Sequence, residues 1–245
     1  MFIIKSSDLF LSEPIIPDIL ITSSVFGLLL ILCRILFNLK QRIQPTIEVG
    51  NMKDFILENE HVLLRPLTED DFELLLPYSL NEPDTWHFSP RSAAGEDNLR
   101  EYMNYALTKK AEGTEYPFVV IDKKSGQCAG STRYYNINER NRNLEIGFTW
   151  YGKAFRGTGL NKQCKFLLLQ HAFELMNILR VGFKADATNI LSVAAMKSVG
   201  AKEEGILRQD TLMSDGRFRD TMVLSILQHE WQDSVKAALL AKLAK

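Results

Sequence analysis

A glycine-rich turn is the part of this sequence best suited to bind a charged ligand. It reads Arg156-Gly157-Thr158-Gly159-Leu160-Asn161, and the apolar residues over 160–176 that follow have helical spacing. The first turn of a helix leaves backbone N–H groups unpaired at the positive end of the helix dipole. Glycine lets a ligand approach the backbone closely, and Arg156 adds a charged donor. The turn therefore predicts a pyrophosphate site that needs no metal ion.

Other interpretations of this turn are open or excluded. A Gly-x-Gly pair alone is also typical of a tight turn without a ligand. A Rossmann dinucleotide site is excluded, because Lys162 stands where the third glycine belongs and hairpin-like strands flank the unit. The sequence has no P-loop, HExxH or GxSxG motif, and its 3 cysteines and 4 histidines are scattered. We therefore predict no metal: neither a bound metal ion nor a P-loop is indicated.

Size and charge bound the remaining choices. The chain has 245 residues, of which 46% are hydrophobic, enough for one sizeable core with length left for a tail. The formal net charge is -1 and no basic stripe dominates, so we expect no nucleic-acid partner. The odd number of scattered cysteines fits a reducing compartment.

The hydrophobic pattern predicts an α/β domain. In chain order the predicted elements are a strand at 55–66, helices at 68–80 and 96–111, strands at 116–122, 128–137 and 143–150, a helix at 160–176, a strand at 181–187, a helix at 190–199, and strands at 201–213 and 218–228. The hairpins give antiparallel pairs, and the strand–helix–strand unit gives a parallel pair. We expect a mixed, twisted, mostly antiparallel sheet with a central parallel pair and flanking helices.

Residues 1–51 differ in character from the domain, which we expect at 52–232 with a peripheral helix at 233–245. The run at 19–37 holds one charge, Arg34, and approaches the ~20 residues that cross a bilayer. Lys40 and Arg42 follow it, so a membrane helix would leave the domain in the cytoplasm. A helix docked on protein is the second interpretation, and a natural start at Met52 is the third. We expect a cytoplasmic domain in each case.

Three further blocks accompany the glycine turn. They are the helix segment Asn189–Ala201, the strand segment Asn143–Phe148 and the hairpin segment Asp215–Asp220. In this order and spacing, the blocks resemble the GCN5-related N-acetyltransferase (GNAT) superfamily, in its RimJ/RimL-like branch of ribosomal-protein N-terminal acetyltransferases. The resemblance covers about residues 55–231. Asn161 departs from the family's glycine or alanine, and Met196 stands where many relatives carry a tyrosine.

The resemblance implies an enzyme, an N-acetyltransferase that moves an acetyl group from acetyl-CoA to a primary amine by direct attack on the thioester. Acetyl-CoA is then a co-substrate, and the acceptor is a protein N-terminus or a small amine. In relatives a bulge in the strand before the turn carries the backbone contacts to the acyl group and pantetheine arm. Here those contacts fall to Phe148, Thr149 and Trp150, with residues 156–161 on the pyrophosphate.

The resemblance also points to catalytic side chains. Glu145 is the candidate base that takes a proton from the amine, and Ser192 is the candidate acid for the leaving thiolate. Asn189 is expected to bond the pantetheine amides. Each has a plainer alternative, respectively a strand glutamate paired with Arg140 or Arg142, a first-turn serine and a helix N-cap.

Aromatic residues supply candidates for the acceptor wall. Trp86 and Phe88 lie in the loop after the first helix, and Tyr134 lies on a central strand, although core packing is the commoner role of such side chains. A second function stays open, because a fold does not guarantee activity. It is a catalytically silent module that binds acyl-CoA or a partner.

Overall fold

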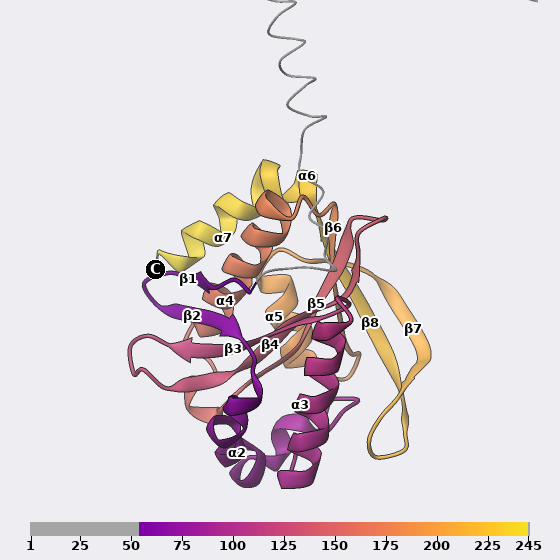
Figure 1. Ribbon diagram of the computed structural model, residues 1–245. Coiled ribbons are helices and arrows are strands. Elements are labelled where there is room, and N and C mark those ends of the chain that lie inside the picture. Colours follow the sequence, from indigo (N-terminus) through magenta and orange to yellow (C-terminus); the bar gives the residue numbers. More distant parts are fainter. Residues whose placement is uncertain (1–53, 245) are drawn as a thin grey trace, which may run out of the picture. The chain divides into compact units, whose positions relative to one another are not determined.

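The computed structural model describes residues 54–244, and one 8-stranded mixed sheet runs through them (Figure 1). The strand order is β1-β2-β3-β4-β5-β6-β8-β7. β5 (Asn143–Tyr151) and β6 (Arg180–Asp186) run parallel, whereas the other neighbouring strands are antiparallel. The predicted mixed sheet with a central parallel pair is therefore confirmed. The tail at 1–51, with its apolar run, lies outside the described residues.

The remaining elements follow the predicted order closely. The strands are β1 (Leu57–Glu58), β2 (Val62–Pro66), β3 (Tyr116–Asp122), β4 (Cys128–Asn138), β7 (Lys202–Leu212) and β8 (Phe218–Leu227). The helices are α2 (Phe72–Asn81), α3 (Glu96–Ala111), α4 (Leu160–Gln170), α5 (Ile190–Ser198), α6 (Gln228–Glu230) and α7 (Lys236–Leu243). Among the helices that the structure describes, none is long and apolar enough to cross a membrane.

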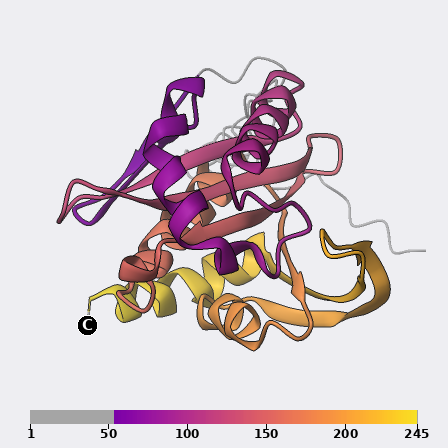
Figure 2. The same cartoon turned by 90° about the horizontal axis from the view of Figure 1, so that it is seen from below.

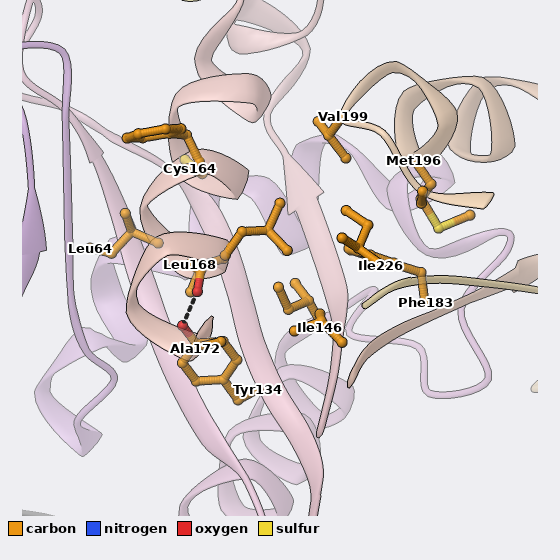
Figure 3. Close-up of a cluster of buried hydrophobic side chains, with 14 of the residues drawn as sticks. Leu64, Tyr134, Ile146, Cys164, Leu168, Ala172, Phe183, Met196, Val199 and Ile226 are labelled. Atoms are coloured by element: carbon orange, nitrogen blue, oxygen red, sulfur yellow. Dashed lines mark hydrogen bonds between the residues drawn. The ribbon is translucent and has the colours of Figure 1, made fainter. Parts of the chain in front are cut away.

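Helices cover both sides of the sheet, as Figure 2 shows. The side under α4, α5 and α7, here the α4 face, holds the larger apolar core, part of which is drawn in Figure 3. There Tyr134 of β4 points at α4, and its hydroxyl donates to the carbonyl oxygen of Leu168 at 2.6 Å. The side under α2 and α3, here the α3 face, holds a second core that includes Leu75, Leu99 and Trp150.

The C-terminal helix starts before the predicted range of 233–245 and contacts the larger core along one side. It begins at Gln228 and continues through a π-helical turn (Trp231–Val235) into α7. Trp231 is fully buried against Phe166 and Phe173, and Leu239 is also buried. Three apolar anchors at helical spacing, Trp231, Val235 and Leu239, hold this helix on the domain.

A histidine is enclosed where the helical layer meets the N-terminal strands. His171 opens the π-helical turn (His171–Leu175) that continues α4, and its ring stacks on Phe55 with centroids 4.3 Å apart. The ring of Tyr134 is also near, with centroids 6.1 Å apart. Burial lowers the pKa of His171 to about 4, because a charged imidazole loses hydration there.

We expect His171→Phe to remove part of the acid sensitivity of folding. Histidine in an unfolded chain titrates near pH ~6.5, whereas His171 in the folded chain has a pKa of about 4. Between these values the unfolded state binds the extra proton, so the stability of the wild type falls as the pH falls. The contribution of this group is at most about 3 kcal/mol. Phenylalanine keeps the stacked ring and has no proton to bind.

Urea unfolding of both proteins at about pH 7 and about pH 4.5 measures this difference in the free energy of unfolding. His229→Phe is the control, because His229 is exposed and should leave the acid sensitivity unchanged. Equal acid losses in the wild type and His171→Phe would contradict the prediction.

Candidate functional site

The parallel pair β5–β6 opens partway along its length. The two strands pair at three positions, of which the last joins Glu145 to Gly182, and no later pair links them in the described chain. β5 nevertheless stays paired with β4 as far as Tyr151, and β6 with β8 as far as Asp186. The facing backbone groups of β5 and β6 beyond Glu145 therefore need another partner. An extended ligand that pairs with a strand edge would satisfy them.

β5 carries a bulge inside this opening. The pairing with β4 shifts so that Phe148 and Thr149 stand opposite a single residue, Thr132. Phe148 has φ 47°, a left-handed conformation that is rare for a bulky residue and costs about 1–3 kcal/mol. The bulge expected from the resemblance is thus present, at the residues predicted to contact the acyl group.

The glycine turn follows the C-terminal end of β5 and leads into α4 at Leu160. Gly157 and Gly159 have φ of +76° and +89°, and a Cβ built on either glycine meets no atom within 4 Å. Thr158 between them donates a hydrogen bond to the carbonyl oxygen of Phe155 at 2.8 Å. The turn therefore leaves open space beside a helix N-terminus, which fits a pyrophosphate group.

The other side chains of the turn are held by the protein. Arg156 donates from Nε to the carbonyl oxygen of Tyr151 and from Nη2 to Oγ1 of Thr85, each at 2.8 Å. The hydroxyl of Tyr151 donates to Oδ1 of Asn161 at 3.3 Å, and Leu160 is buried. Arg156 thus ties the turn to β5 and to the segment before α3. A contact from Arg156 to phosphate stays a prediction.

α5 begins at the same end of the open strand pair, because it follows β6 directly. Asn189 caps this helix, and its Oδ1 accepts a hydrogen bond from the backbone N–H of Ser192 at 3.1 Å. The plainer interpretation of Asn189 as an N-cap therefore holds, and a second contact to a ligand stays a prediction. Beside them Ile190 and Leu191 are 76% and 85% exposed.

Glu145 lies on the α3 face, at the position where the strand pair opens. Its Oε1 lies 3.1 Å from Nζ of Lys184 and accepts a hydrogen bond from Nδ2 of Asn136 at 3.3 Å. Its Oε2 is buried and has no hydrogen-bond partner among residues 54–244. The carboxylate is therefore paired with Lys184 rather than with Arg140 or Arg142. Oε1 is held by two partners, whereas Oε2 is enclosed by the protein.

Tyr135, the neighbour of Tyr134 in β4, shares this face with Glu145. Its ring fills the space of the missing side chain of Gly147, where an added Cβ would lie 2.6 Å from Cε1 of the ring. The ring also packs edge-on against Phe148, with centroids 5.2 Å apart. Burial raises the pKa of Tyr135 well above its usual value, and the nearby carboxylate of Glu145 adds to the rise. Side chains alternate between the two faces of a strand, so Tyr134 and Tyr135 point to opposite sides of the sheet. This alternation is the sequence signal that distinguishes the two tyrosines.

A buried ion pair supports the bulge from the α3 face. Arg133 of β4 is fully buried, and its Nη1 lies 2.7 Å from Oε2 of Glu115. Its guanidinium packs over the ring of Phe148 at 4.2 Å and near that of Tyr102 at 4.8 Å. The Tyr102 hydroxyl also donates to the carbonyl oxygen of Phe148 at 3.5 Å. Phe148 therefore keeps its left-handed backbone against a rigid, charged support.

The predicted acceptor aromatics divide between core and surface. Tyr134 is fully buried on the α4 face, away from Glu145, so its place in the core corrects its assignment to an acceptor wall. Trp86 is 2% exposed and packs on Trp150 with ring centroids 5.2 Å apart, so it too is a core residue. Phe88 is half-buried beside His87, in the loop before α3.

A pocket of about 560 Å³ lies beside Glu145 on the α3 face. β5 and β6 form its floor, and β7 and β8 complete it. Its charged groups are two ion pairs, Glu145–Lys184 and Arg180–Glu204, and its apolar groups include Ile206, Leu207 and Val223. The pocket thus combines two ion pairs with an apolar surface. Within the described chain, no cluster of His, Cys, Asp and Glu side chains could hold a metal ion.

Comparison with known proteins agrees with this geometry. Residues 61–202 match the family model described as an acetyltransferase (GNAT) domain. The chain is 29% identical to "Putative ribosomal N-acetyltransferase YdaF" of Bacillus subtilis, over 71% of this chain and 95% of that protein. A solved acetyltransferase structure from T. thermophilus is 34% identical, with a TM-score of 0.70, covering 78% of this chain and 100% of that one.

The fold also matches Mycobacterium smegmatis RimJ in complex with CoA-disulfide, with a TM-score of 0.65 and 22% identity, covering 79% of this chain and 96% of that one. The family model spans more than half of the chain, and the opened strand pair, the bulge and the glycine turn lie in the order that the resemblance implies. The chain therefore belongs to the GCN5-related N-acetyltransferase (GNAT) family and is an acetyltransferase.

Proposed function

We propose that this enzyme transfers the acetyl group of acetyl-CoA to a primary amine by direct attack of the amine on the thioester. The observation that carries the proposal is the opening between β5 and β6, which starts at Glu145 and contains the bulge at Phe148. The glycine turn and the start of α5 lie at the far end of that opening. One extended ligand can therefore reach from the turn to Glu145.

Binding of acetyl-CoA would use groups that the fold leaves free. The pyrophosphate would sit on the backbone at Gly157–Leu160, where the helix dipole and unpaired N–H groups favour negative charge. The pantetheine arm would pair with the β5 edge at Phe148–Trp150, and Asn189 is the predicted side-chain contact to its amides. This arrangement would put the thioester at the bulge, between the turn and Glu145.

Acetyl transfer requires a neutral amine, because an ammonium has no lone pair. The amine nitrogen would form a bond to the thioester carbon, and the carboxylate of Glu145 would take the proton, directly or through a water molecule. The carbon–sulfur bond would then break, and the hydroxyl of Ser192 would donate a proton to the departing thiolate and regain one from water. Backbone N–H groups of the bulge would stabilise the oxyanion of the tetrahedral intermediate. The products are an acetylated amine and CoA.

A protein N-terminus is our proposed acceptor. Its support is the pocket beside Glu145, which combines carboxylates with apolar residues of β7 and β8, and the relative named as a ribosomal N-acetyltransferase. Thiol release from acetyl-CoA would be measured with short peptides bearing free N-termini, with the same peptides blocked at the N-terminus, and with small amines. Turnover confined to small amines would contradict this acceptor. Tight CoA binding without turnover on any amine would instead favour the silent module.

The glycine turn gives a prediction on cofactor affinity. We expect Gly159→Val to weaken CoA binding at least about tenfold, or ~1.4 kcal/mol, because the side chain would occupy the open space beside the turn. Gly216→Val is the matched control, since Gly216 also has a positive φ and open space around it but lies in the β7–β8 turn. Calorimetric titration with CoA measures both variants. Unchanged affinity in folded Gly159→Val would sink the assignment of the turn.

The second prediction concerns the base. We expect Glu145→Gln to lower kcat by about 100-fold with little change in CoA affinity, because glutamine keeps the shape and cannot take the proton. Glu203→Gln is the control, since Glu203 is an exposed β7 residue paired with Lys197. Steady-state kinetics of thiol release would be compared with CoA titrations. Full activity of Glu145→Gln would exclude Glu145 as the base.

A further inference from the structure

A buried lysine lies directly behind the bulge, on the α4 face, and the proposed reaction gives it no role. Lys165 of α4 is only 6% exposed. Its Nζ donates a hydrogen bond to Oγ1 of Thr149 at 2.7 Å and approaches Oγ1 of Thr132 at 3.4 Å. Thr149 and Thr132 also bond each other at 2.7 Å. The lysine therefore meets both strands at the point where the bulge distorts their pairing.

No counter-charge accompanies this lysine. Among the described residues, no carboxylate lies within ion-pair distance of its Nζ, and β4 and β5 offer it hydroxyl groups. The titratable group beside it on α4 is the thiol of Cys164, whose pKa burial raises to about 11, so the thiol stays neutral. The other nearby charge on β4 is Arg133, which points to the α3 face and is paired with Glu115.

An ammonium in this position is costly to bury. Burial lowers the pKa of Lys165 to about 8, so the amine is still mostly protonated near neutral pH. Such a cation is stabilised when negative charge appears nearby, because the surroundings screen it weakly. The proposed reaction produces negative charge at this place, first on the carbonyl oxygen and then on the departing sulfur.

We propose that Lys165 is a positioning and electrostatic residue of the acetyl transfer, which fixes the bulge through Thr149 and holds a positive charge behind the reacting thioester. The inference rests on the proposed function, because that function sets the thioester at the bulge. Lys165 would act through Thr149 and need not touch the substrate. Its hydrogen bond fixes the Thr149 side chain, and its charge lowers the energy of the transition state more than that of the bound thioester.

The direct test is Lys165→Met. Methionine has a similar length without a charge, and Thr132 and Thr149 can still bond each other, so we expect the variant to fold. We expect kcat to fall at least about tenfold while CoA affinity stays within about twofold, since the lost interaction acts mainly in the transition state. Lys124→Met is the control, because Lys124 is exposed in the β3–β4 turn and should retain full activity.

A pH profile separates this role from a structural one. The wild-type kcat/KM is divided by that of Lys165→Met at each pH. The pH dependence that both proteins share, from the acceptor amine and Glu145, then cancels. We expect this ratio to fall as the pH rises through about 8, where Lys165 loses its charge. Lys165→Arg, which keeps the charge at all of these pH values, should recover part of the activity and lose this dependence. A ratio that is independent of pH would overturn the proposal.

Coupling to the bulge is measured with Thr149→Val. If Lys165 acts through the Thr149 hydroxyl, the double variant Lys165→Met with Thr149→Val should be little slower than the slower single variant. Additive losses of kcat in the double variant would show that Lys165 does not act through Thr149. Full kcat in Lys165→Met would overturn the whole inference. Failure of the proposed function itself looks different, since the wild type would then release no thiol with any amine.

Stability gives an independent readout of the buried charge. The pKa of Lys165 is about 8 in the folded chain and ~10.4 when unfolded, so the unfolded state binds more protons between these values. Wild-type stability relative to Lys165→Met should therefore rise with pH across this window. Near neutral pH the variant should be at least as stable as the wild type, since it buries no charge. A marked loss of stability in Lys165→Met would assign the lysine a structural role instead.

Discussion

The site depends on one constraint, which is that β5 and β6 stop pairing after Glu145 and Gly182 while each keeps its outer neighbour. Backbone groups inside a sheet are normally satisfied by the adjacent strand, so an opening in the centre requires a substitute. A ligand with amide groups along its length, such as a pantetheine arm, can fill that place. The parallel direction of the pair also brings the starts of α4 and α5 to the same end of the opening. In the proposed function, the strand pair therefore sets both the path of the ligand and the place of its phosphates.

Holding a central strand in this conformation takes support from both faces. On the α3 face, Arg133 packs against Phe148 and is balanced by Glu115. On the α4 face, Lys165 bonds Thr149 and has no carboxylate partner in the described chain. The two cations therefore differ in kind. The first is neutralised by its partner and supports shape, whereas the second keeps its charge and lowers stability, which is typical of residues retained for activity.

Much of this arrangement could be predicted from the sequence, because it follows from local patterns. Apolar periodicity predicted the strands and helices with errors of a few residues, and the glycine turn predicted the start of α4. The start of the C-terminal helix was harder to predict, because the helix begins at Gln228, directly after β8 ends at Leu227. Lys165 was missed because it lies between Cys164 and Phe166 on the buried side of α4, where a lysine is unexpected. That contradiction between residue type and periodicity was the available signal.

The strand β5 shows why a local sequence pattern was insufficient to predict the site. Alternation in β5 sets Glu145 and Gly147 on the α3 face, and without a bulge residue 149 would follow them there. The extra residue at Phe148 reverses the alternation, so that Thr149 meets Lys165 on the α4 face and Trp150 joins the second core. Sequence spacing alone does not reveal this reversal. It allows a single strand to present a carboxylate to one side of the sheet and, a few residues later, a hydroxyl to the other. The carboxylate of Glu145 and the hydroxyl that Lys165 binds therefore lie on opposite faces of the same strand, on either side of the bulge.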